Sequence, residues 1–341
     1  MPVQAPADRR LRHHWVRLIA ALLAFVVLVV LATMWWWDTE PALFDPAAVT
    51  QAQMQELKRP VSVGSTTTAT LIASVQTLLE KRGGYLSNDK LPPGVFLDNQ
   101  PNWEFGSLTA SRDLVRALRN DFSRAQTQSR EDADLAEADP LLNSPNDRWL
   151  LPSSESQYRK AIKHLDGYLH RLDDAASSDA HFYARADNLA DYLQLASSRL
   201  GSLSQRLSAS VGQLGLTSAN EPTAGAGAES AGPGEVGRTV KTPWTKVDDN
   251  FYEARGYTWA LLEQLRAIQH DFGPILRSKR ADVSLQQAIR ELEEAQRPLR
   301  SPIVLNGSPF GFFANHSLVM ANYVSRANAT LIDLRELLRR G

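Results

Sequence analysis

The chain has 341 residues, of which 43% are hydrophobic and 22% are charged, and this composition excludes wholesale disorder. It contains no cysteine, which excludes disulfide bonds, thiolate metal sites and cysteine nucleophiles. The formal net charge of −1 gives no electrostatic footprint for nucleic acid, so we expect no nucleic-acid partner.

The first predicted element is a transmembrane helix at residues 18–37, LIAALLAFVVLVVLATMWWW, which carries no charge. At about 1.5 Å per residue it spans roughly 30 Å, the thickness of a bilayer's hydrocarbon core. Four arginines precede it and three acidic residues follow it closely, which predicts that residues 1–17 form a cytoplasmic tail.

A cleaved signal peptide is the alternative, but its apolar region is shorter and ends in small residues, whereas this run ends in Trp35, Trp36 and Trp37. We therefore predict an uncleaved anchor that contacts the lipid bilayer through residues 18–37. The predicted location is the bacterial inner membrane, in a single-pass protein whose N-terminus is cytoplasmic and whose main domain is periplasmic.

The exported part begins with a predicted stalk at residues 38–60, in which prolines frame a small helix at 47–58. Residues 61–216 follow as the first part of a helical bundle. Apolar side chains recur there with helical spacing in the segments 71–79, 108–122 and 158–172.

Two longer helices carry a heptad seam, because apolar side chains recur in alternating steps of four and three over residues 189–207 and 247–272. Between them, residues 217–243 contain five glycines and almost no large apolar side chain, which predicts a flexible linker. Residues 244–341 form the second part of the bundle, with further helices at 281–296 and 315–339.

The simplest arrangement packs the two seams against each other as an antiparallel hairpin. The predicted fold class is therefore all-α, with an N-terminal transmembrane helix followed by a periplasmic helical bundle of long antiparallel helices.

A faint internal similarity links residues 113–124, DLVRALRNDFSR, with residues 261–274, LLEQLRAIQHDFGP. Both segments place Leu-Arg ahead of Asp-Phe on a predicted helix. Chance similarity among amphipathic helices is the simpler explanation, and an ancient duplication is the alternative.

No motif for catalysis or metal binding is present: the sequence contains no His-Glu-x-x-His, P-loop or Gly-x-Ser-x-Gly. The acidic cluster at residues 131–139 lacks the glycine and the terminal glutamate of a calcium-binding EF-hand loop, so a solvated helix or turn is the favoured interpretation. We expect no metal and no cofactor.

One loop interrupts the helical pattern at residues 83–106, GGYLSNDKLPPGVFLDNQPNWEFG. Its prolines, glycines and asparagines are typical of a specified turn, and its apolar side chains predict a loop that packs onto the bundle. A ligand or partner site is the alternative. The candidate residues of this binding or packing loop are Leu91, Pro92, Pro93, Phe96, Asp98, Asn99, Asn102, Trp103 and Glu104. Among them, Asp98 and Glu104 are the candidate pair for acid–base catalysis.

Four segments carry a resemblance to a known family: GGYLSNDKLPPGVFLDNQPNWEFG, SREDADLAEADP, NDRWLLPSSESQYRK and VDDNFYEARGYTWALLEQLRAI. With these the chain resembles a family of proteobacterial single-pass inner-membrane proteins classified only as a domain of unknown function. The resemblance implies an envelope protein with no assigned reaction, and it transfers no site residue.

We expect a binding or scaffolding role in the cell envelope, with an envelope protein or a second copy of the chain as partner. One alternative is a periplasmic hydrolase acting on cell-wall or lipid material through Asp98 and Glu104. Another is a sensor bundle that signals through a partner, because the predicted tail at residues 1–17 is too short for an output domain.

Overall fold

The computed structural model describes residues 7–125, 130–172, 179–215, 238–301, 303–309 and 311–340. The predicted all-α fold class is confirmed, with one pair of three-residue strands beside the helices. The long elements are α1 (Ala7–Trp37), α2 (Pro46–Leu57), α3 (Ser65–Glu80), α4 (Asn99–Ala117), α5 (Ala133–Leu142), α6 (Ser154–Leu172), α7 (Ala186–Ser208), α8 (Val247–Asp271), α9 (Gly273–Ser278), α10 (Asp282–Ala295) and α11 (His316–Arg339). The short elements are η1 (Gly94–Phe96), η2 (Leu118–Phe122), η3 (Ala209–Val211), η4 (Trp244–Lys246), β1 (Gln213–Gly215) and β2 (Arg238–Val240).

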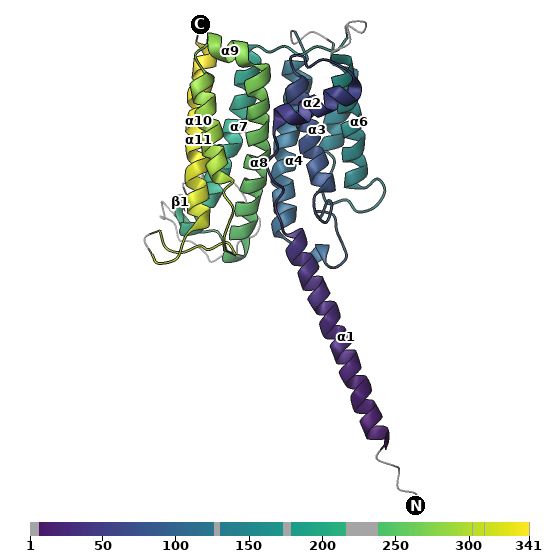
Figure 1. Cartoon of the computed structure of the whole chain (residues 1–341). Coiled ribbons are helices and arrows are strands. Elements are labelled where there is room, and N and C mark those ends of the chain that lie inside the picture. The colour runs from purple at the N-terminus through teal and green to yellow at the C-terminus, as the bar shows by residue number, and fades with distance from the viewer. Residues whose placement is uncertain are drawn as a thin grey trace, which may run out of the picture.

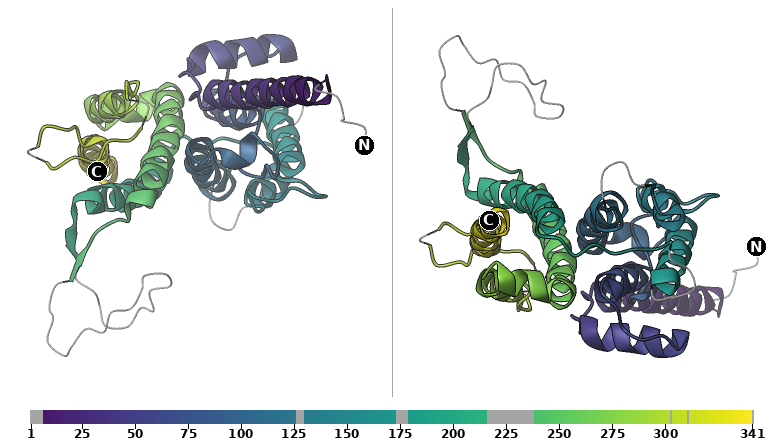
Figure 2. Two further views of the ribbon diagram at one scale, coloured as in Figure 1. Left: turned by 90° about the horizontal axis from the view of Figure 1, so that it is seen from below. Right: turned by 90° about the horizontal axis from the view of Figure 1, so that it is seen from above.

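Eight of these helices form two four-helix units that stand side by side (Figures 1 and 2). Unit I consists of α3, α4, α5 and α6, and unit II of α7, α8, α10 and α11. In each unit the first helix packs against the second and fourth, and the third packs against the second and fourth. This repeated helix order favours the duplication as the origin of the internal similarity in the sequence.

The units meet along α4 and α8, which run parallel and form one of the two most extensive helix contacts of the chain. Two glycines permit this contact. A Cβ atom at Gly106 would lie 2.0 Å from the carbonyl oxygen of Glu253, and one at Gly256 would lie 1.9 Å from that of Trp103. Because no side chain fits in either place, the two helix backbones touch directly.

Aromatic side chains fill the space on both sides of this crossing. Trp103 is fully buried and packs against Trp259, with ring centroids 5.1 Å apart. Further along the same helices, Phe122 packs against Phe272 at 5.2 Å. The aromatic pairs at both levels join one unit to the other, so the apolar core is continuous across the boundary.

The predicted hairpin of α7 and α8 is wrong as the main packing, because the seam of α7 faces α11. Ser197 Oγ donates to Asn328 Oδ1 at 2.6 Å, and Ser204 Oγ donates to the carbonyl oxygen of Ala321 at 3.2 Å, so the two helices run antiparallel. The buried side chains of α11 show the same steps of four and three: Met320, Val324, Ala327, Leu331, Leu334 and Leu338. A heptad seam indicates that a helix packs against another helix. When several helices carry the same seam, the spacing does not indicate which of them is the partner.

The predicted division of the bundle at residues 217–243 does not coincide with this packing. Helix α7, which the sequence placed in the first part, packs with the helices of the second part. Residues 216–237, most of the predicted linker, lie outside the described residues. Strands β1 and β2 pair antiparallel on either side of them, with Gly215 opposite Arg238.

The segment at residues 38–60, predicted to be a stalk, packs against the bundle instead. A Cβ atom at Gly83 would lie 2.7 Å from the ring of Trp37, so the end of α1 already touches unit I. Asn99 Nδ2 then donates to Asp38 Oδ2 at 3.0 Å, and α2 lies against α3 and α8. No spacer therefore separates α1 from the bundle.

Candidate functional site

Glu104, one of the two candidate catalytic carboxylates, is fully buried on α4 and holds the predicted loop in place. Its Oε1 lies 2.7 Å from Lys81 Nζ and accepts the backbone N–H of Leu86 at 2.8 Å. Its Oε2 accepts the backbone N–H of Ser87 at 2.8 Å. Burial raises the pKa of Glu104, while the contacts with Lys81 and Ser87 lower it. A carboxylate with these partners is a structural anchor for the turn after α3.

Asp98, the other candidate, lies in a different place. It lines a cavity of roughly 300 Å³ together with Trp244, Tyr252 and Ile303, to which Glu104 does not contribute. The structure therefore does not bring the two candidate carboxylates to one cleft, as a general acid–base pair requires.

Some of the remaining candidate residues of the loop have fixed conformations or hydrogen-bond partners, and others are exposed to solvent. Asn102 Nδ2 donates to Asp249 Oδ1 at 3.0 Å, and a cis peptide bond joins Pro92 to Pro93. Leu91 and Phe96 are 68% and 61% exposed. The packing interpretation therefore holds for Trp103 but not for these two apolar side chains.

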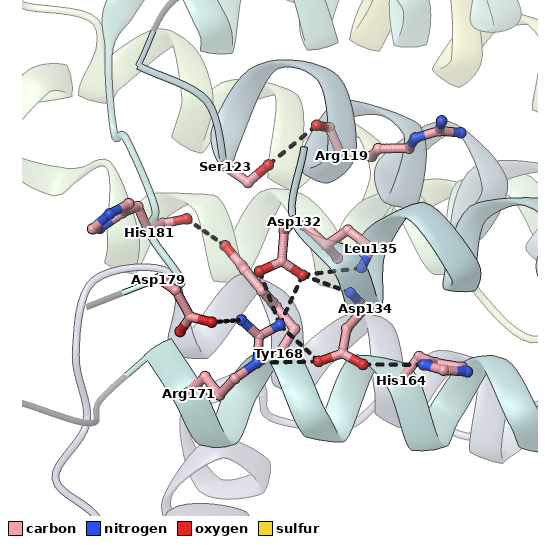
Figure 3. A network of polar contacts seen from close by, with 10 residues as sticks. All are labelled: Arg119, Ser123, Asp132, Asp134, Leu135, His164, Tyr168, Arg171, Asp179 and His181. Atoms are coloured by element: carbon pink, nitrogen blue, oxygen red, sulfur yellow. Dashed lines mark hydrogen bonds and ion pairs between the residues drawn. The ribbon is translucent and has the colours of Figure 1, made fainter. Parts of the chain in front are cut away.

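The acidic cluster folds into the start of α5, where Asp132 and Asp134 contact basic side chains of α6 (Figure 3). Glu131 and Asp139 pair with Arg119 of η2. Asp132 Oδ1 caps α5 by accepting the backbone N–H groups of Asp134 and Leu135 at 2.9 and 3.1 Å. Arg171 Nη2 lies 2.9 Å from Asp132 Oδ2 and 2.6 Å from Asp134 Oδ2. His164 Nδ1 lies 3.0 Å from Asp134 Oδ1.

Neighbouring residues extend this network (Figure 3). Asp179 Oδ2 lies 3.2 Å from Arg171 Nη1. Tyr168 Oη donates to the carbonyl oxygen of His181 at 2.7 Å, and burial raises the pKa of Tyr168, which keeps the phenol a donor. Within the described ranges, no group of three or more potential ligands is arranged to hold a metal ion. The cluster is thus a structural network.

The strongest candidate site is a groove of roughly 230 Å³ at the boundary of the two units, between α4, α7 and α8. We call it the arginine groove, because four of its side chains carry guanidinium groups. It is lined by Phe105, Thr109, Arg112, Asp113, Arg116, Asn143, Arg199, Ser202, Leu203, Arg206, Glu253 and Tyr257.

Two of the arginines are paired with carboxylates: Arg199 across the boundary between the units, and Arg206 within unit II. Arg199 Nε on α7 lies 3.0 Å from Asp113 Oδ2 on α4. Arg206 binds Glu253 with two bonds of 2.6 Å each, in a bidentate pair of the kind that fixes geometry. Burial raises the pKa of Asp113, although the bond from Arg199 lowers it.

The other two arginines form no salt bridge with a carboxylate of the described residues, although the charge of Arg116 lowers the pKa of Asp113. Arg112 donates to the carbonyl oxygens of Leu142 and Ser144 at 2.7 and 2.8 Å, which leaves its positive charge in place. Arg116 is exposed and makes no hydrogen bond to a described residue. The lining therefore carries four guanidinium groups against two carboxylates.

The lining of the groove contains hydroxyl groups and carboxylates but no histidine. No local signal in the sequence marks it, because its charged residues lie on three helices and are separated by up to 141 positions along the chain, from Arg112 to Glu253.

The N-terminal region provides a second feature. Within the part of the chain that the structure describes, a single helix segment, His13–Trp37, is long and apolar enough to cross a membrane. None of its most apolar stretch is covered by the rest of the molecule (Figure 1).

Comparison with known proteins places the chain in one family. The family described as "Uncharacterized protein conserved in bacteria (DUF2333)" matches residues 9–341, and the chain belongs to it. No curated protein and no solved structure matches the chain.

Proposed function

We propose that this member of the DUF2333 family is a single-pass protein of the bacterial inner membrane with a binding or scaffolding role in the cell envelope. Residues 18–37 anchor it, residues 1–17 lie in the cytoplasm and the two units lie in the periplasm. The arginine groove receives an anionic group of an envelope protein or of a second copy of the chain.

The arginine groove is the observation that carries the binding role. Its charge excess is set by Arg112 and Arg116. The Arg199–Asp113 pair joins α7 to α4, and the Arg206–Glu253 pair joins α7 to α8. A guanidinium group that reaches solvent beside fixed ion pairs is suited to a planar carboxylate or a phosphate.

The location and orientation rest on the sequence around α1. The apolar segment has the length of a bilayer core, arginines precede it and three tryptophans end it at the expected aromatic belt. A hydrolase has less support than a binding role. Glu104 is buried and binds Lys81 and the backbone of the loop, whereas Asp98 lines a cavity that Glu104 does not reach.

Photo-crosslinking in cells tests the binding role. Benzoylphenylalanine placed at Ser202 in the full chain should give a discrete adduct, and Arg116→Glu in the same chain should remove it by cancelling the net positive charge of the groove. Mass spectrometry of the adduct separates an envelope protein from a second copy of the chain.

Two matched controls accompany this experiment. Arg290→Glu reverses an exposed charge on α10 outside the groove and should leave the adduct unchanged. A probe at Ile332 on the exposed side of α11 should not give the same adduct. The same products at both probe positions, or an adduct insensitive to Arg116→Glu, would contradict a binding role for the groove.

Fusions to the C-terminus test the orientation. Alkaline phosphatase, which needs the periplasm, should be active, and a green fluorescent protein fusion should be dark. The reverse pattern would place the two units in the cytoplasm.

A further inference from the structure

Exposed aromatic and aliphatic side chains gather on the loops at one end of the bundle. All four connections at this end contribute: residues 81–98, 143–153, 238–246 and 296–315. Phe312, Leu151 and Trp244 are the most exposed, at 107%, 95% and 86%. We define the apolar rim as Phe96, Trp149, Leu151, Trp244, Phe312 and Phe313.

Contacts between the loops show that they share this end. Tyr85 Oη donates to the carbonyl oxygen of Asn146 at 3.0 Å, and Asn306 Nδ2 donates to that of Ser210 at 3.1 Å. The cavity lined by Asp98 and Trp244 joins unit I to unit II at the same level.

The opposite end of the bundle has a different surface. Within the described residues, its exposed large apolar side chains are the valines Val61, Val63 and Val283, and no tryptophan or phenylalanine is exposed there. A scattered set of valines is ordinary for a protein surface, whereas six large side chains on four separate loops form a patch that needs an explanation.

The apolar rim lies at the end from which α1 leaves the bundle (Figure 1). Trp37 touches Gly83 and Asp38 accepts a hydrogen bond from Asn99, so the loop at residues 81–98 begins where α1 ends. With no spacer, a membrane that contains α1 up to its tryptophan belt reaches the level of the rim.

The charge of the same loops also fits a lipid surface. Residues 81–98, 143–153, 238–246 and 296–315 together hold nine lysines and arginines but only three aspartates. Three of the nine are paired with acidic residues on the adjoining helices: Lys81, Lys246 and Arg297. Basic side chains beside exposed aromatic residues are the combination by which peripheral proteins bind anionic lipid headgroups.

We propose that the apolar rim rests on the bilayer, with its aromatic side chains in the headgroup layer and its basic side chains on anionic phospholipids. This inference rests on the proposed membrane anchor and adds a second, peripheral contact to it. The contact fixes the orientation of both units relative to the membrane and so holds the arginine groove in a defined orientation above it.

Single-cysteine labelling of the full chain tests the proposal, since the protein has no cysteine of its own. Nitroxide labels at Phe96→Cys, Leu151→Cys and Phe312→Cys are measured in nanodiscs that contain phosphatidylglycerol. We expect each label to show a several-fold higher accessibility to oxygen than to a water-soluble nickel complex, as in the headgroup layer. The control label at Val283→Cys should show the opposite ratio, as in water.

The outcomes separate the rim from the anchor. A label at Val26→Cys reports on α1 and should show the oxygen-dominated ratio of the bilayer core; if it does not, the anchor itself is wrong. If Val26→Cys does report lipid but the rim labels report water, the rim proposal alone is overturned. Rim labels shielded from both oxygen and nickel would overturn it as well, because they would indicate a protein partner in place of lipid.

Discussion

Units I and II have the same helix order but are held together by different forces. In unit II, α7 and α11 pack along an uninterrupted apolar seam, in which Leu200 and Leu331 are fully buried. In unit I, the corresponding α3 and α6 make a smaller contact, and ion pairs join neighbouring elements: Lys81 with the buried Glu104, and Arg171 with Asp132 and Asp134.

The difference follows from the length of the third helix. Helix α5 has 10 residues where α10 has 14, so it covers less of unit I. The loop at residues 81–98 compensates, and a loop needs partners for its backbone N–H groups, which Glu104 supplies. One architecture can therefore be stabilised by apolar burial or by buried polar contacts, and the two should respond differently to mutation and to pH.

The largest effect is expected at the crossing that both units share. Gly256→Val would force side-chain atoms into the backbone of α4, where even a Cβ atom lies 1.9 Å from the Trp103 carbonyl oxygen. We expect a loss above about 4 kcal/mol or a failure to fold, measured by thermal and urea unfolding of the solubilised chain.

Gly201→Ala is the matched control, because Gly201 lies within α7 and the nearest atom to its added Cβ is 3.6 Å away. This change should stabilise the chain by about 0.5–1 kcal/mol, the usual helix preference for alanine. An equal loss in both variants would mean that glycine is not required for the contact between the units.

The second effect breaks the buried charge of unit I. Lys81→Met leaves Glu104 buried without its cation and should cost about 3–5 kcal/mol at neutral pH. Burial holds the pKa of Glu104 above its unfolded value, so protonation favours the folded state and stability should recover as the pH falls. Adding Glu104→Gln should recover part of the loss at neutral pH, and a loss that did not change with pH would refute this account.

The third effect breaks the apolar seam of unit II. Leu331→Ala removes a fully buried side chain from the contact of α11 with α7 and should cost about 2–5 kcal/mol. Because no titrating group is involved, this loss should be the same at pH 5 and pH 8. A strong pH dependence would show that the two units do not differ in the way described above.

The smallest effect concerns a contact through which unit II also depends on protonation. Burial raises the pKa of Glu263 from 4.5 to about 7, against the opposing effect of Arg266, and its Oε1 accepts the backbone N–H of Phe44 at 3.2 Å. The stabilisation from proton binding is complete below pH 4.5 and is lost as the pH rises through about 7.

Glu263→Gln should therefore flatten the dependence of the melting temperature on pH in this range, with a change of at most about 3 kcal/mol between its ends. The melting curves of the variant and the wild type should differ most above pH 7. Parallel curves for the two proteins across the whole range would contradict the raised pKa.

The sequence predicted the helices well because each depends on local information. The apolar stripe at residues 71–79 predicted α3, and Gly83 and Gly84, both with positive φ, turn the chain after this helix. The burial of Trp103 also followed from its residue type. The acidic cluster was expected to be a solvated helix or turn, and the sequence did not reveal that Arg171, more than thirty residues away, pairs with two of its aspartates.

By itself, the sequence determined the helical fold class, the apolar N-terminal helix and the family, since these depend on composition, periodicity and segment length. Only the tertiary structure decided which seams meet, because α7, α8 and α11 carry the same spacing and the choice among them depends on shape. Because Gly106 and Gly256 have no side chain, α8 packs closely against α4. Helix α7 packs mainly against α11. The arginine groove and the apolar rim arise in the same way, from residues that are distant along the chain and become neighbours only when these helices pack.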